Sequence, residues 1–173
     1  DGEKGAVMFA SGAINGGRSA SGPFSDAMVG SDTIVAAVND AADDSSVKAI
    51  VLRVDSPGGS ALASDLMWYA IENAKAKKPV VVSMGDVAAS GGYYIACNAN
   101  KIVAEPATIT GSIGVVTARF GADELLQKIG VGTETLKRGA RAGLLDPTQP
   151  LTPDEVTALD AEIGGVYDGF VDV

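Results

Sequence analysis

Ser90 lies in a stretch of small residues at 85–94 that follows an apolar, β-branched run at 79–84. The run predicts a buried strand, and residues 93–96 can continue as a helix, so Ser90 is expected at a strand-to-helix junction. The two glycines behind Ser90 permit close backbone approach, and amides that open a helix favour negative charge beside them. A nucleophilic serine with an oxyanion pocket needs this arrangement. A tight packing contact between helix and strand would also favour small residues here.

A second glycine-rich turn, at 55–60, follows another apolar run at 48–54. In a parallel sheet both turns lie at the carboxyl ends of their strands, where sites form. One amide from the Gly58–Gly59 region and one from Gly91 would then make a two-donor oxyanion hole, and loss of such a donor typically costs about 3 kcal/mol of transition-state stabilisation. The alternative is a plain turn before a helix. A phosphate loop is excluded because the Gly-Lys-Ser/Thr ending is missing.

Composition narrows the possible chemistry. The 173 residues contain no histidine, so neither a Ser-His-Asp triad nor a histidine-ligated zinc site can form within the chain. Serine chemistry must therefore use a lysine, an N-terminal amine, or a base from another chain or domain. The net charge of −9 argues against a nucleic-acid surface, and the single cysteine, Cys97, excludes an intrachain disulfide. We expect no metal and no cofactor.

The remaining pattern alternates strands and helices, which predicts an α/β fold with right-handed crossovers and a mostly parallel sheet. Further strands are expected at 5–10 and 101–104, and a weaker one at 134–137. Helices are expected at 31–43, after residue 60, at 123–129 and from Thr152, where a Thr-Pro-Asp-Glu sequence forms a capping box. The glycine- and serine-rich stretch 11–30 predicts a long mobile loop.

The length suits a single α/β domain over residues 1–173. The chain begins at Asp1 without methionine and stops inside an expected helix, so we expect a fragment of a longer protein. No run of 18 apolar residues and no signal peptide occur, and we expect the fragment itself to be soluble.

The segments 55–59, 85–94 and 110–114 resemble motifs of the signal peptide peptidase A (protease IV) family in their order and spacing. The resemblance extends over nearly the whole chain, from Gly5 to the last helix. The resemblance implies a crotonase/Clp-protease-like fold with repeated ββα-type units. It also implies a Ser/Lys dyad protease that degrades cleaved signal peptides at a membrane. By motif match Ser90 is the nucleophile, Gly59 and Gly91 are the oxyanion donors, and Ser112 is the serine that helps to orient the lysine amine.

The chain departs from the family pattern at the general base. In single-domain members a lysine stands a few residues past a Lys-x-Gly segment, and that position is Ala142 here. Lys137 comes too early in the pattern, and Arg141 cannot deprotonate. In double-length members the serine lies in the C-terminal half and the lysine comes from the N-terminal half. We therefore interpret this chain as a serine-bearing half whose lysine, deprotonated by desolvation, is supplied by another domain or subunit.

This interpretation implies several partners. We expect an extended peptide as substrate, and the other half of the same protein or sister subunits of a homo-oligomer as neighbours, with residues 138–150 and the last helix as contact surfaces. We expect membrane association through a segment outside this chain, facing the periplasm or the cell exterior of a bacterium. Three alternatives stay open: a catalytically inactive scaffold or assembly half, a crotonase-like acyl-CoA enzyme, and a phage capsid-maturation protease.

Overall fold

The computed structural model describes residues 3–22 and 25–173 and divides into two compact units. The first unit comprises Asp1–Gly114 with Phe170–Val173, and the second comprises Val115–Gly169. The single domain expected over residues 1–173 stays a prediction, and each unit is described by itself.

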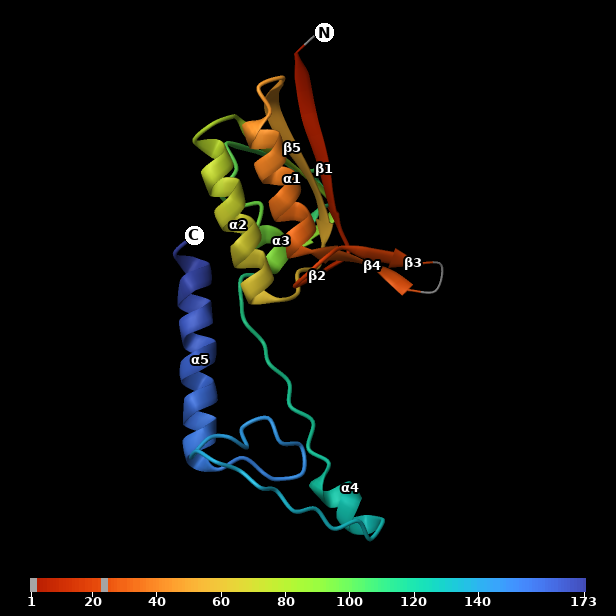
Figure 1. Ribbon diagram of the computed structural model, residues 1–173, viewed down its shortest axis with the longest axis vertical. Coiled ribbons are helices and arrows are strands. Elements are labelled where there is room, and N and C mark those ends of the chain that lie inside the picture. Colours follow the sequence, from red (N-terminus) through yellow and green to blue (C-terminus); the bar gives the residue numbers. More distant parts are fainter. Residues whose placement is uncertain (1–2, 23–24) are drawn as a thin grey trace. The chain divides into compact units, whose positions relative to one another are not determined.

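A five-stranded parallel sheet forms the centre of the first unit (Figure 1). Its strands are β1 (Lys4–Ser11), β5 (Val47–Ser56), β6 (Val80–Ala89), β7 (Lys101–Val103) and β8 (Ile109–Gly111). The order is β1-β5-β6-β7, and β8 pairs with the end of β6, with every pairing parallel. The predicted α/β class and mostly parallel sheet are confirmed.

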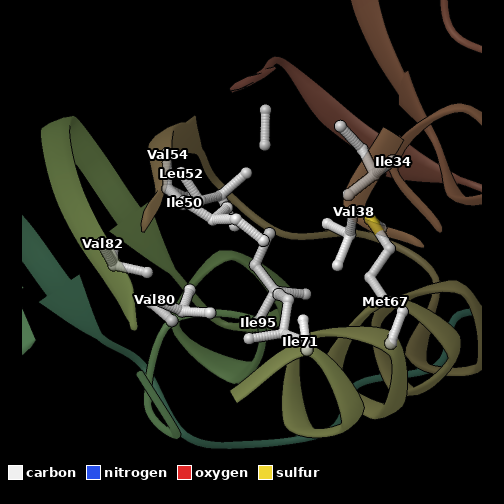
Figure 2. Close-up of a cluster of buried hydrophobic side chains, with 14 of the residues drawn as sticks. Ile34, Val38, Ile50, Leu52, Val54, Met67, Ile71, Val80, Val82 and Ile95 are labelled. Atoms are coloured by element: carbon white, nitrogen blue, oxygen red, sulfur yellow. The ribbon is translucent and has the colours of Figure 1, made fainter. Parts of the chain in front are cut away.

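Two long helices cover one face of this sheet and enclose the core (Figures 1 and 2). They are α1 (Ser31–Asp43) and α2 (Ala61–Lys75). Alternate residues of β5 point inward, as the two-residue period of a strand requires, and meet helix residues spaced three or four apart. Figure 2 shows the labelled core side chains Ile34, Val38, Ile50, Leu52, Val54, Met67, Ile71, Val80, Val82 and Ile95, all at most 3% exposed. Each fully buried large side chain contributes about 1.5–3 kcal/mol relative to exposure.

The predicted loop at 11–30 is wrong, because the described part of this stretch forms a small three-stranded sheet. Its strands are β2 (Ala13–Asn15), β3 (Ala20–Gly22) and β4 (Ser25–Gly30), in the order β2-β4-β3. Two apolar side chains, Ile14 and Val29, anchor it in the core at 1% and 2% exposure. The Ser19 hydroxyl accepts a hydrogen bond from the Gly30 amide at 2.9 Å. A glycine- and serine-rich sequence can therefore be ordered by few apolar contacts when its polar groups are paired.

The second unit contains α4 (Asp123–Lys128) and most of α5 (Pro153–Val171). The predicted capping box is confirmed: the Thr152 amide donates to Glu155 Oε2 at 2.9 Å, and the Glu155 amide donates to Thr152 Oγ1 at 3.2 Å. The strand expected at 134–137 is wrong. No strand forms anywhere in residues 115–169, so this segment has no ladder to join, and its Leu136 is 92% exposed.

Candidate active site

Ser90 occupies a strained turn between β6 and the short helix α3 (Gly91–Tyr94). Its φ of 50° and ψ of −121° are uncommon for a residue with a side chain. Both sides of the turn are fixed, because the Ser90 amide donates to the Gly111 carbonyl at 2.8 Å and the Tyr94 amide donates to the Ser90 carbonyl at 2.9 Å. A strained strand-to-helix turn is one way in which a fold presents a nucleophilic serine.

The two glycine-rich turns are in direct contact, as their places at the ends of β5 and β6 predict. A Cβ built on Gly58, whose φ is 97°, would lie 2.6 Å from the Gly91 nitrogen and 2.8 Å from the Ser90 Cβ. A Cβ on Gly91 would lie 2.4 Å from Ser64 Oγ and 3.3 Å from the Gly59 nitrogen. Only glycine fits at these two positions, and the absence of side chains brings both backbones against Ser90.

The amides of Gly59 and Gly91 have no hydrogen-bond acceptor among the described residues. Their neighbours differ, because the Gly58 amide donates to Ser56 Oγ at 3.1 Å and the Ser60 amide donates to the Ile14 carbonyl at 2.9 Å. Gly91 opens a helix, where the first amides lack intrahelical partners. Two unpaired amides beside a serine can stabilise a developing oxyanion. The structure thus brings Ser90, Gly59 and Gly91 together, while their catalytic roles stay predictions.

Strand β2 holds Gly59 in place, and the sequence reasoning missed this. The Ile14 amide donates to the Gly58 carbonyl, and the Ile14 carbonyl accepts from the Ser60 amide, each at 2.9 Å. A Cβ on Gly59 would lie 2.1 Å from the Ile14 oxygen. The available signal was a pair of apolar residues, Ile14 and Val29, in a stretch otherwise rich in glycine and serine. The main-chain pairing of Ile14 across the domain has no local signature.

Ser112 is also brought to this end of the sheet. It follows Gly111, which pairs with Ala89 and accepts the Ser90 amide hydrogen bond. Ser112 has a φ of 52° and an exposed side chain. The chain therefore turns sharply one residue beyond the strand that pairs beside Ser90. The role predicted for Ser112, which is to orient a lysine amine, stays a prediction.

The lysines of the first unit all lie far from Ser90, at the amino ends of the strands or just before β6. They are Lys4, Lys48, Lys75, Lys77, Lys78 and Lys101. Lys101 is level with Val81, which precedes Ser90 by about 20 Å along the strand once the irregularity in its pairing with β5 is taken into account. Among the described residues of this unit, no lysine can therefore reach the serine. Ala142, the position expected for the base, is an exposed turn residue of the second unit.

Two other titratable groups near α3 have structural roles. Burial raises the pKa of Tyr94 to about 12, and its hydroxyl donates to Asp65 Oδ1 at 2.9 Å, so it stays protonated at neutral pH. Its ring packs edge-on against Trp68 with centroids 6.4 Å apart. Burial also raises the pKa of the Cys97 thiol, which donates to the Tyr94 carbonyl at 3.2 Å. These contacts fix α3 on α2, next to the Ser90 turn.

Residues 3–22 and 25–173 contain no cluster of three or more histidine, cysteine, aspartate or glutamate side chains able to hold a metal ion. None of the helices within these residues combines the length and the apolar character that a bilayer crossing requires.

Comparison with known proteins gives a family match and two long curated relatives. The model of peptidase family S49 matches residues 72–173. The chloroplastic serine protease SPPA of Arabidopsis thaliana is 54% identical over 126 residues, which cover 72% of this chain and 19% of that protein. Protease 4 of Salmonella typhi is 42% identical over 167 residues, which cover 96% of this chain and 26% of that protein. The chain therefore spans about a fifth to a quarter of the length of these relatives.

A solved structure of a ClpP1 mutant from Listeria monocytogenes is similar over 51% of this chain and 43% of that one. The TM-score is 0.39 and the sequence identity is 19%. At this level the similarity carries no argument, and the fold class rests on the sheet topology described above.

Proposed function

Because the chain belongs to peptidase family S49, we propose that it is the serine-bearing part of a serine endopeptidase with Ser90 as nucleophile. The family resemblance drawn from the three sequence segments is confirmed. The observation that most supports the proposed role is the strained Ser90 turn flanked by the unpaired amides of Gly59 and Gly91. These groups supply a nucleophile and two oxyanion donors without any side chain between them.

In the proposed reaction the Ser90 hydroxyl attacks the carbonyl carbon of a peptide bond. A base takes the hydroxyl proton, and the carbonyl oxygen becomes an oxyanion that accepts hydrogen bonds from the Gly59 and Gly91 amides. The intermediate then collapses, the amine leaves with the proton returned by the base, and an acyl ester forms on Ser90. Water, activated by the same base, hydrolyses the ester and releases the free serine.

The proposed base is a lysine from another domain or subunit. This proposal is supported by the positions of the first unit's lysines, which lie at the opposite end of the sheet, and by alanine at position 142. A lysine is neutral near pH 7 only where desolvation lowers its pKa. The domain or subunit that supplies the lysine must therefore also exclude water from Ser90. The exposed Ser112 hydroxyl could accept a hydrogen bond from the lysine amine.

The second unit supports the proposal of an assembled partner, either the other half of the protein or a sister subunit. Within residues 115–169, Glu155 is the one buried residue. Large apolar side chains are instead exposed on it, among them Val116, Phe120, Leu125, Ile129, Leu136 and Leu145. Apolar exposure on this scale marks an interaction surface.

The proposed substrates are short extended peptides, including cleaved signal peptides, and the proposed place of action is a membrane surface facing the periplasm or cell exterior. These proposals rest on the resemblance of the sequence motifs to signal peptide peptidase A. An extended peptide could place its carbonyl at Ser90 by adding as a strand to a sheet edge.

Turnover of a fluorogenic peptide tests the proposal, using this chain alone, the full-length protein, and a Ser90→Ala variant of each. We expect the isolated chain to be inactive and the full-length protein to cleave in a Ser90-dependent way. Cleavage by the isolated chain would show that the base lies within these residues. A full-length protein that neither cleaves nor reacts with a fluorophosphonate at Ser90 would favour the second candidate, an inactive assembly half, which the alanine at position 142 supports.

A further inference from the structure

Strand β6 carries an irregularity directly before Ser90. Val54 of β5 pairs with Met84 of β6, but the next pair along the two strands is Ser56 with Ala88. Two steps along β5 therefore correspond to four steps along β6, and the surplus residues form a bulge over residues 85–87. A bulge leaves ladder groups unpaired and bends its strand.

Side chains from two neighbouring segments satisfy the main chain of this bulge. Asp55 Oδ1 accepts the Val87 amide hydrogen bond at 3.1 Å, and Thr108 Oγ1 donates to the Gly85 carbonyl at 2.8 Å. A Cβ on Gly85 would lie 2.8 Å from the Asp55 Cγ, so glycine is needed there for the carboxylate to approach. Asp55 and Thr108 thus bond to the bulge from opposite sides in the sheet.

The bulge is also the place where β6 changes its partner. Before it, residues 81–83 pair with β7, and from its last residue, Val87, onward, residues 87–89 pair with β8. The final three residues of β6 carry Ser90 directly, and Ser90 then hydrogen-bonds to Gly111 and contacts Gly58. A change in the bulge would shift the register of this terminal segment, and Ser90 with it, relative to the Gly59 amide.

We propose that Asp55 and Thr108 are positioning residues that hold the β6 bulge in the register that places Ser90 against the Gly58–Gly59 turn. This inference rests on the proposed function, because it assigns their importance to the reactivity of Ser90. Neither side chain needs to touch substrate. Displacement of a nucleophile by about 1 Å can cost a hundredfold in rate, whereas loss of one exposed hydrogen bond costs little stability.

The test measures kcat, KM and the rate of fluorophosphonate labelling of Ser90 in the full-length protein. Asp55→Ala should lower kcat and the labelling rate roughly ten- to a hundredfold, with KM within about twofold. Asp55→Asn keeps an oxygen acceptor and should restore both rates to within about threefold of wild type. Thr108→Val and Thr108→Ser form a second pair at the other side of the bulge: the valine variant should lower both rates, and the serine variant, which keeps the hydroxyl, should restore them. This pair tests the proposal if Asp55→Ala gives no folded protein.

Asp44→Ala is the matched control, because Asp44 Oδ1 also accepts a main-chain amide hydrogen bond, from Ser46 at 2.8 Å, but before the amino end of β5. It should leave both rates unchanged. Equal labelling of wild type, Asp55→Ala and Thr108→Val would overturn the positioning role while leaving Ser90 as the nucleophile. Equal losses in Asp55→Ala and Asp55→Asn would also overturn it. Labelling and turnover that persist in Ser90→Ala would instead overturn the proposed function.

Discussion

The two compact units bury their apolar side chains to very different degrees. In the first, parallel strands and the helices α1 and α2 exclude water from a continuous core, with Leu52 and Met67 fully buried. In the second, Leu136 and Val116 are more than nine-tenths exposed, and the one buried residue is the acidic Glu155. The first unit can therefore hold a strained serine turn by itself, whereas residues 115–169 have no comparable core.

Polar contacts are what hold the second unit together. Arg141 forms an ion pair with Asp154 at 2.9 Å, and Asp146 accepts hydrogen bonds from Thr135 and Thr148 at 2.7 Å. Exposed pairs of this kind contribute about 0–1 kcal/mol each. Such contacts specify a local conformation but do not replace a core.

The largest contrast concerns independent folding. We expect a peptide of residues 115–169 to show no cooperative thermal transition by circular dichroism, because its apolar side chains have no core to enter. The whole chain should unfold cooperatively through its first unit. A sharp transition with dispersed amide resonances in the isolated peptide would contradict the contrast.

The same substitution, leucine to alanine, compares how much a buried and an exposed side chain contribute to stability in the two units. Leu52→Ala should lower the free energy of unfolding by about 2–5 kcal/mol, because it leaves a cavity in the core. Leu136→Ala should change it by less than about 0.5 kcal/mol in the isolated chain. Urea denaturation measures both. If Leu136→Ala proves as costly as Leu52→Ala, the second unit has a core of its own.

A pair of glycines separates local strain from crowding at the site. Both Gly58 and Gly139 have positive φ values, 97° and 110°, so alanine costs about 1–2 kcal/mol of backbone strain at either. Only at Gly58 does the new Cβ also collide, with Gly91 and Ser90. We expect Gly58→Ala to be more destabilising by about 1–3 kcal/mol and to abolish Ser90 labelling in the full-length protein. If Gly58→Ala and Gly139→Ala have similar stability and similar Ser90 labelling, the collision at Gly58 has no effect beyond backbone strain.

The smallest effect is a pH dependence confined to the start of α5. Hydrogen bonds from the Thr152 amide and hydroxyl hold the pKa of Glu155 below its ordinary value of 4.5. A lowered pKa stabilises the folded helix start fully above that value, and the stabilisation is lost as the pH falls through the lower folded value. Protection factors for amide exchange at the start of α5, which correct for the pH dependence of the intrinsic exchange rate, should therefore fall as the pH drops below about 4.5. Glu155→Gln should remove that dependence, and a pH response unchanged by it would assign the effect elsewhere.

The sequence predicted the features that have local signatures. The β-branched runs, the glycine-rich turns and the Thr152 capping box predicted the strands β5 and β6, the turns that follow them and the start of α5, because each depends on neighbours in sequence. The small sheet around Ile14 and the bulge before Ser90 were missed. Both depend on pairing between residues far apart in the chain, which has no local signature in the sequence. The strand expected at 134–137 was wrong because propensity cannot supply a partner strand.

Strand β1 and strand β2 together make the amino-terminal segment a structural support of the Gly58–Ser60 turn. β1 is an edge strand that pairs only with β5 in its sheet, and Ile14 of β2 clamps the Gly58–Ser60 main chain. In the terms of split proteins, we expect a peptide of residues 4–15 to act as a complementing fragment. A protein that lacks these residues should keep Ser90 but lose the main-chain hydrogen bonds that hold the Gly58–Ser60 turn, and the added peptide should restore them in trans.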